Sequence, residues 1–175
     1  INGAAAEQVA DGLTQAGYIA TSVAVDVTSP DSTRAMADAA VAAFGRLDGL
    51  INNAGGMVRR VPYAEVSEQD YDEIMDLNAR SVIVASQAAI APLKSAGGGF
   101  IINTTSIAAR NGASGGAGMY GSSKAFVHNV TRGMAKELIP FGIRVNAVAP
   151  GVIETPFHER YSTPAPTTRG ATGRA

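Results

Sequence analysis

The chain has 175 residues, of which 46% are apolar and 17% are charged, a composition typical of one globular domain rather than of a disordered segment. Its formal net charge of -1 and isoelectric point of about 6.1 give no electrostatic reason to expect nucleic acid or an anionic membrane as a partner. Cysteine is absent, which excludes disulfides and thiolate metal sites and indicates a cytoplasmic location, and no apolar run approaches the ~20 residues of a membrane span.

The first third of the chain predicts two helices with a strand between them. Asn2 is a suitable N-cap for a helix that Gly17 would stop. Residues 21–27 are rich in β-branched side chains and alternate in the manner of a strand. Ser29-Pro30 then matches an N-cap with proline at the first helical position, and this second helix would end at Gly45.

The middle of the chain predicts a strand, a long helix and another strand. Residues 47–52 are a short apolar run that leads into a polar, glycine-containing corner. Ser67, with Asp70 three residues later, makes a capping box that would open a long helix, and Pro92 should kink or end it. Residues 100–105 are apolar and β-branched and follow three glycines, which indicates a buried strand.

The last third contains a further helix and strand before the periodicity stops. Ser106 lies where the preceding strand would end, and after a Gly- and Ala-rich loop a helix would begin near Met119 and end by Pro140. Residues 143–148 predict another strand. Residues 162–175 contain Thr, Pro, Gly, Arg and Ala without periodicity, which predicts a disordered tail.

Strands that alternate with long helices predict an α/β fold with a parallel sheet. Ligands of such sheets bind beyond the carboxyl ends of the strands. Polar or glycine-rich corners follow all four predicted strands, at Asp26, Asn53–Gly55, Ser106 and Pro150-Gly151. The sequence therefore predicts a cleft at this edge of the sheet.

Tyr120 and Lys124 are four residues apart and share one face of their predicted helix. A phenol is a poor acid at neutral pH, with an ordinary pKa of about 10, and an ammonium one turn away favours the phenolate. Such a pair can exchange a proton with a hydroxyl or carbonyl oxygen, which the hydroxyl of Ser106 could also hold. A tyrosine beside a solvated lysine is the alternative interpretation of this short motif.

Taken together, the motifs resemble the short-chain dehydrogenase/reductase family over about residues 1–160. The matching positions, in the family's order and nearly at its spacing, are Asp26-Val27-Thr28, Asn52-Asn53-Ala54-Gly55, Asn78, Ser106, Tyr120, Lys124, Asn146, Pro150-Gly151 and Thr155. The resemblance implies a three-layer αβα fold with a Rossmann-like, doubly wound parallel sheet in a domain spanning 1–161. The family's first two strands and its last strand have no counterpart in this sequence.

The resemblance also implies catalytic roles for four residues. Tyr120 would be the general acid/base, Lys124 would favour its ionisation and bind the nicotinamide ribose, and Ser106 would orient the substrate oxygen. Asn78 would hold a water that connects the lysine to solvent, although an exposed helix asparagine is an open alternative. His128, one turn beyond the lysine, is interpreted as a packing or surface residue.

The implied cofactor is NAD or NADP. Its expected contacts are Asp26 and Val27 for the adenine, then Asn53, Ala54, Gly55, Tyr120, Lys124, Pro150, Gly151, Ile153 and Thr155. Ordinary turn roles for Asp26 and for residues 53–55 stay open as alternatives. The glycine-rich turn that would bind the pyrophosphate, and the residue that would select NAD or NADP, have no counterpart here, so a chain that is part of a longer protein is expected.

Three functions follow from these observations. The first is NAD(P)-dependent interconversion of a secondary alcohol and a ketone, with a 3-oxoacyl or polyol compound as the suggested substrate. The second is a catalytically inactive fragment that keeps an oligomerisation or structural role, and the third is a nucleotide-binding regulator. A small-molecule substrate and a homo-dimer or homo-tetramer formed through helices 69–93 and 119–140 are the expected partners, with no nucleic acid, membrane or metal.

Overall fold

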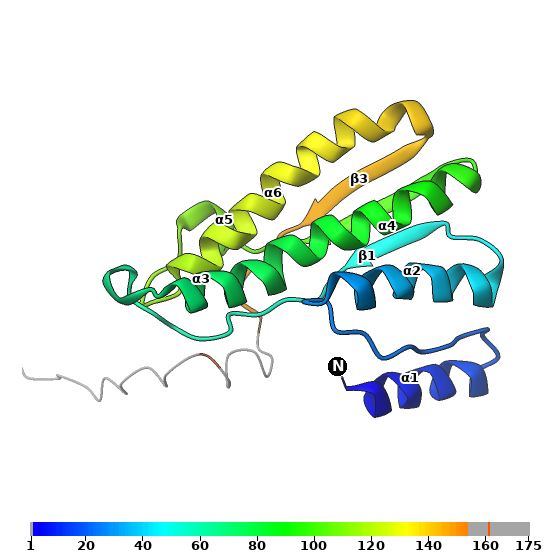
Figure 1. Cartoon of the computed structure of the whole chain (residues 1–175), viewed down its shortest axis with the longest axis horizontal. Helices are drawn as coiled ribbons and strands as arrows, with labels where there is room; N and C mark the ends of the chain where they lie inside the picture. The colour runs from blue at the N-terminus through cyan, green and yellow to red at the C-terminus, as the bar shows by residue number, and fades with distance from the viewer. Residues whose placement is uncertain (1, 154–160, 162–175) are drawn as a thin grey trace, which may run out of the picture.

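Three parallel strands form the sheet of the computed structural model, which describes residues 2–153 and 161 (Figure 1). They are β1 (Gly49–Asn52), β2 (Gly99–Thr104) and β3 (Ile143–Val148), in the order β1-β2-β3. Asn52 lies beside Asn103, and Asn103 beside Ala147, so the three strands end at the same edge. The parallel sheet with its covering helices confirms the predicted α/β class.

Helices connect the strands and cover one face of the sheet. The helices of the described residues are α1 (Gly3–Gln15), α2 (Pro30–Phe44), α3 (Glu68–Met75), α4 (Ser81–Ser95), α5 (Ala108–Asn111) and α6 (Gly118–Leu138), of which α4 and α6 contact the strands. Short 3₁₀ turns occur at Tyr63–Glu65 and Ile139–Phe141, and a π-helical segment at Asp76–Arg80 joins α3 to α4. Helices α4 and α6 share one core cluster with the sheet and so lie on the same face, as right-handed crossovers that advance in one direction would place them, and α2 packs beside α4 (Figure 1).

The hydrophobic core lies between the sheet and helices α4 and α6. Its buried members are Ala89, Leu93, Ile101, Leu138, Ile143 and Val145. Ile101 and Asn103 of β2 are fully buried on this face, whereas Ile51 of β1 points to the opposite face and is 62% exposed. The strand pattern therefore places one face against the helices and leaves part of the other accessible.

Local capping signals produce the helix starts that the sequence predicts. Asn2 accepts a hydrogen bond from the Ala5 amide, and Ser29 accepts one from the Ser32 amide with Pro30 in the first turn. Ser67 and Asp70 form the complete capping box at the start of α3. These starts depend on contacts within four residues, which is why sequence alone predicts them.

The strand expected at residues 21–27 does not form, and that prediction is wrong. The segment connects α1 to α2 as an extended, largely exposed chain, with Val23 48% exposed. A strand needs a neighbouring backbone to complete its hydrogen bonds, and among the described residues β1 pairs with β2 alone. Asp26 instead accepts bonds from the amide and hydroxyl of Thr28 and turns the chain toward α2.

Pro92, which was expected to kink or end the long helix, does not end it, since α4 continues to Ser95. A proline removes one backbone donor, but the Ala96 amide still bonds to the Pro92 carbonyl and the Gly98 amide to the Leu93 carbonyl. The fully buried Leu93 anchors this last turn in the core. The helix ends instead before Gly97 and Gly98, whose φ angles are 89° and 121°.

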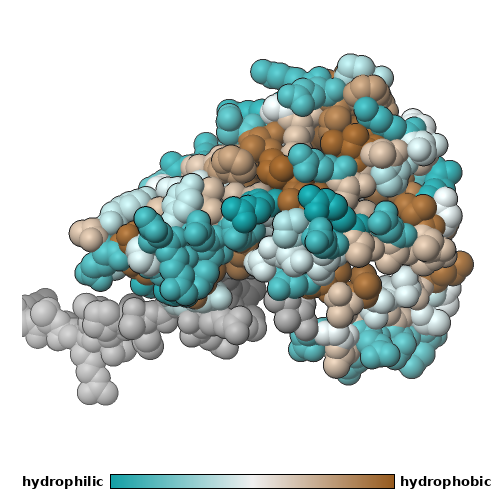
Figure 2. Space-filling model, viewed as in Figure 1, coloured by the Kyte–Doolittle hydropathy of each residue, from teal (hydrophilic) through white to brown (hydrophobic). Residues whose placement is uncertain are grey.

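Helices α4 and α6 are the elements through which a homo-dimer or homo-tetramer was predicted, so their exposed side chains are relevant to that prediction. Four small residues were expected to permit close contact between these helices: Ala85 and Ala89 are buried within this chain, whereas Ala88 and Ala125 are partly exposed. Large apolar side chains are nevertheless exposed on α6 and after it, with Phe126 42%, Ile139 67% and Phe141 45% exposed, and Figure 2 shows apolar surface over these two helices. The homo-oligomer stays a prediction. No helix in the described part of the chain combines the length and apolarity needed to cross a bilayer.

Candidate functional site

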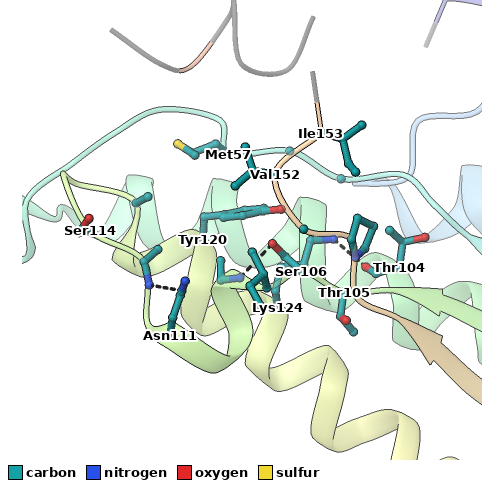
Figure 3. Close-up of a pocket in the computed structure, with 18 of the residues that line it drawn as sticks. Met57, Thr104, Thr105, Ser106, Asn111, Ser114, Tyr120, Lys124, Val152 and Ile153 are labelled. Carbon is teal, nitrogen blue, oxygen red and sulfur yellow. Dashed lines mark hydrogen bonds between the residues drawn. The ribbon is translucent and has the colours of Figure 1, made fainter. Parts of the chain in front are cut away.

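A cavity of about 670 Å³ opens at the carboxyl ends of the three strands. It is lined by segments that follow β1, β2 and β3, together with the first two turns of α6 (Figure 3). The predicted site residues among its lining are Asn53, Gly55, Ser106, Tyr120, Lys124, Pro150, Gly151 and Ile153. The structure therefore brings together residues that are up to 100 positions apart in the sequence.

Ser106 is held at the end of β2 by bonds to the chain that leaves β3. The Thr105 amide donates to the Val148 carbonyl at 2.8 Å, and the Ile107 amide donates to the Pro150 carbonyl at 3.0 Å. The Ser106 Oγ accepts a bond from the Ala108 amide at 3.1 Å, an interaction that leaves its hydroxyl proton for another acceptor. This hydroxyl can therefore donate to an oxygen in the cavity.

Tyr120 and Lys124 project from consecutive turns of α6 into the same cavity (Figure 3). The Lys124 Nζ lies 6.0 Å from the centre of the Tyr120 ring and donates to the Thr104 carbonyl at 3.0 Å. Only 3% of Lys124 is exposed, and this burial lowers the pKa of its amine from 10.5 to about 8. The pair is therefore not the solvated surface pair of the alternative interpretation.

Asn78 lies in the π-helical segment and is fully buried. Its Oδ1 accepts from the Gly56 amide at 3.0 Å, and its Nδ2 donates to the Gly56 carbonyl at 2.8 Å and to the Ile74 carbonyl at 3.0 Å. The side chain thus fastens the corner after β1 to the long helix, which excludes the exposed-asparagine alternative. Its role in holding a water stays a prediction.

The other expected cofactor contacts are not all at the cavity. Ala54 is exposed and does not line it, and Asp26 and Val27 lie just before α2, outside the lining. The Asp26 carboxyl accepts bonds from the amide and hydroxyl of Thr28, which agrees with the turn interpretation of this residue. These bonds lower the pKa of the carboxyl. The contact of Asp26 and Val27 with the adenine stays a prediction. Thr155 and residues 162–175 lie outside the described residues.

Gly55 provides a test of whether the site suits a dinucleotide. A Cβ at this position would lie 2.8 Å from the Asn78 Oδ1 and 2.9 Å from the Lys124 Nζ, closer than carbon atoms approach such groups. Gly55 thus leaves its backbone beside the lysine amine at one wall of the cavity, which Gly56 and Gly151 also line. These residues fit the nicotinamide and ribose end, while the described residues include no glycine-rich turn between a strand and a helix for the pyrophosphate.

The family resemblance placed the loop 56–66 at the substrate pocket, but sequence reasoning named none of its side chains and did not anticipate the other segments of this wall. Met57, Arg60, Asn111, Ser114 and Val152 line it and come from segments that we expected to be irregular. Ala113 and Val58, next to these residues, have positive φ angles of 53° and 63°, a conformation that sequence does not indicate for alanine or valine. Residue patterns of loops carry no period, so periodicity could not show which of these side chains face the cavity.

Comparison with known proteins gives a consistent family assignment. The family model for short chain dehydrogenase matches residues 1–165. Cyclopentanol dehydrogenase of Comamonas sp. (strain NCIMB 9872) is 40% identical over 136 residues, which are 78% of this chain and 54% of that protein. Cis-4-hydroxycyclohexanecarboxylate dehydrogenase of Sinomonas cyclohexanicum is 38% identical over 152 residues, 87% of this chain and 61% of that protein.

A solved structure agrees with this assignment. The chain is similar to 7α-hydroxysteroid dehydrogenase complexed with NADH and 7-oxo glycochenodeoxycholic acid, with a TM-score of 0.88 and 36% identity. The match covers 94% of this chain and 63% of the other. This chain therefore spans between about half and two thirds of the length of the proteins that it matches.

Proposed function

Since the chain belongs to the short-chain dehydrogenase family, we propose that its protein interconverts a secondary alcohol and a ketone with NAD or NADP. The nicotinamide would accept or supply the hydride of this reaction. Asn53, Gly55, Lys124, Pro150, Gly151 and Ile153 are the described residues that would hold that end of the cofactor. A match to solved relatives that bind NADH supports this choice of cofactor.

The residues of this chain would handle the proton and the substrate oxygen. Tyr120 would take the proton of the alcohol in oxidation and return it to the carbonyl in reduction. Ser106 would donate its hydroxyl proton to the same oxygen and hold it in place. The ammonium of Lys124, kept in position by the Thr104 carbonyl, would favour negative charge on the tyrosine oxygen.

The observation that supports this proposal best is the convergence of Ser106, Tyr120 and Lys124 on one cavity. In a solvated tyrosine–lysine pair the lysine would stay exposed. Here 97% of Lys124 is buried, and this burial costs free energy because it desolvates the ammonium. The proposed reaction would use the amine in this place, beside Tyr120. The burial of Lys124 therefore favours the catalytic alternative over the structural one.

The relatives point to alicyclic alcohols as the first substrates to examine. Two of them are dehydrogenases of cyclopentanol and of cis-4-hydroxycyclohexanecarboxylate. The apolar wall that Met57, Val152 and Ile153 provide would suit a saturated ring. We therefore propose a cyclic secondary alcohol rather than the 3-oxoacyl or polyol compound that the sequence suggested.

The test is turnover of a panel of cyclic alcohols with NAD⁺ and with NADP⁺, followed by the absorbance of the reduced nucleotide. We expect oxidation of cyclopentanol or 4-hydroxycyclohexanecarboxylate by at least one of the two cofactors. If neither cofactor binds while light scattering finds a dimer or tetramer, the catalytically inactive alternative with an oligomerisation role is correct.

We expect Gly55→Ala to reduce kcat/KM by about tenfold or more, because its methyl group would displace the Lys124 amine or the Asn78 carbonyl. Gly133→Ala is the matched control, since a Cβ at Gly133 of α6 would meet no atom within 4 Å. Steady-state kinetics of both variants with the same alcohol would check this. Equal activity of the two variants would mean that the close approach at Gly55 is unimportant.

A further inference from the structure

Arg60 lies in the loop after β1 and is one of the residues that line the cavity. Its Nη1 donates to the carbonyls of Ser114 and Gly115, at 3.3 and 2.9 Å, and its Nε donates to the carbonyl of Tyr161. The guanidinium has N–H donors on three nitrogens. Its Nη2 donates to no described residue, so this nitrogen retains two donors for a ligand.

The charged residues that line the described part of the cavity are both cationic. They are Arg60 and Lys124, and no Asp or Glu is among the described lining residues. The neighbouring Arg59 has a different environment, because it pairs with Asp70 and Glu73 of α3. Lys124 already donates to a backbone carbonyl. No carboxylate of the described wall offsets either charge, and Arg60 differs from Lys124 in having a nitrogen, Nη2, that donates to no described residue.

The remainder of the wall separates Arg60 from the reacting atoms. In Figure 3, Met57 and Val152 lie over the Tyr120 ring, and Ser114 lies on the other side of that ring from Ser106. The Ser114 carbonyl is one of the acceptors of Arg60, which places the guanidinium at the Ser114 side of the cavity. An apolar surface thus extends from the catalytic hydroxyls toward a cationic group.

We infer that the substrate of this site carries a carboxylate or a similar anion, which Arg60 binds at the end remote from the reacting carbon. Arginine suits this role because its planar donors match the two oxygens of a carboxylate. The substrate class is an apolar cyclic alcohol or ketone with an anionic substituent. This inference rests on the proposed function, whose site it specifies further.

The same N–H donors of Arg60 could instead bind a phosphate group of the cofactor, because a phosphate is also an anion that accepts hydrogen bonds from a guanidinium. They could also serve only to join the loop of Arg60 to residues 114–115 through the carbonyl bonds. The two alternatives make different predictions for a substituted arginine. A phosphate contact would change nucleotide affinity, and a structural contact would change the turnover of charged and neutral substrates equally.

The experiment compares cis-4-hydroxycyclohexanecarboxylate with its neutral methyl ester in the full protein with saturating cofactor. We expect kcat/KM for the acid to exceed that for the ester by about tenfold or more, and Arg60→Gln to bring the ratio near one. Arg60→Lys keeps the charge and should retain part of the ratio. Arg110→Gln, which removes an exposed arginine of α5 outside the cavity lining, should leave the ratio unchanged.

A binding measurement separates this inference from the proposed function. Calorimetric titration with cyclohexanecarboxylate and with cyclohexanecarboxamide, neither of which can react, should find tighter binding of the acid and loss of that preference in Arg60→Gln. This result would support the inference even if no alcohol were oxidised. An unchanged acid-to-ester ratio in Arg60→Gln, with or without weaker binding of NADH or NADPH, would overturn it.

Discussion

Tyr120→Phe should lower kcat/KM for alcohol oxidation by about 10² to 10⁴, the contribution typical of a positioned general acid or base. The substitution removes one oxygen atom and keeps the ring that lines the cavity, so the packing of α6 should persist. Cofactor affinity, measured by titration of NADH fluorescence, should change little. The combination of lost turnover and retained binding is the expected signature of a proton-transferring residue.

The control for this variant is Tyr71→Phe, the same chemical change at a tyrosine of α3 that is 50% exposed and does not line the cavity. It should keep the activity of the unmodified protein. If Tyr120→Phe retained most of its activity under the same conditions, another group would have to transfer the proton and the proposed role of Tyr120 would be wrong.

Lys124→Met should lower kcat/KM by about 10² or more and should also change how stability depends on pH. Burial lowers the pKa of this amine to about 8, from 10.5 for an exposed lysine. Below about pH 8 the amine is protonated in both the folded and the unfolded state, and the folded state bears the full cost of a buried charge. That cost is what the methionine side chain removes.

Between about pH 8 and 10.5 the folded protein releases the proton of Lys124 while the unfolded chain still holds it. The unfolding free energy of the unmodified protein should therefore rise with pH in this window, by up to about 3 kcal/mol. In Lys124→Met this rise should be missing. The loss of the bond to the Thr104 carbonyl offsets part of the stability that the variant gains near pH 7.

Urea denaturation of both proteins at several pH values between 7 and 10 measures this effect, since taking the difference between them cancels the other titrating groups. Lys136→Met, at an exposed position of the same helix, is the control and should retain the rise. Parallel stability profiles for Lys124→Met and the unmodified protein would show that Lys124 is not desolvated as its burial implies.

Much of the fold follows from short-range patterns in the sequence. The predicted strand 143–148 has the bounds of β3, and the capping residues Asn2, Ser29 and Ser67 begin helices as expected. Each of these features is determined by side chains within about four residues, or by one alternation of apolar and polar positions. Local physics of this kind is fully present in the sequence.

Features that depend on distant partners were not predicted. Residues 21–27 have the composition of a strand, yet strand formation requires a paired backbone, which the sequence of the segment does not contain. The π-helical turn at Asp76–Arg80 forms around the bonds between Asn78 and Gly56, which are 22 residues apart. Arg60 lines the cavity, where it donates hydrogen bonds to the carbonyls of residues more than fifty positions away.

The sequence by itself determined which reactive side chains this protein carries at the proposed site: a serine at a strand end, and a tyrosine and a lysine one helical turn apart. Only the tertiary structure decided that Lys124 is buried, that Gly55 leaves room beside it, and that the wall of the cavity is cationic at Arg60. The reason is physical. Residue type sets what a group can do, whereas burial, pKa and access depend on neighbours that the chain brings together only when it folds.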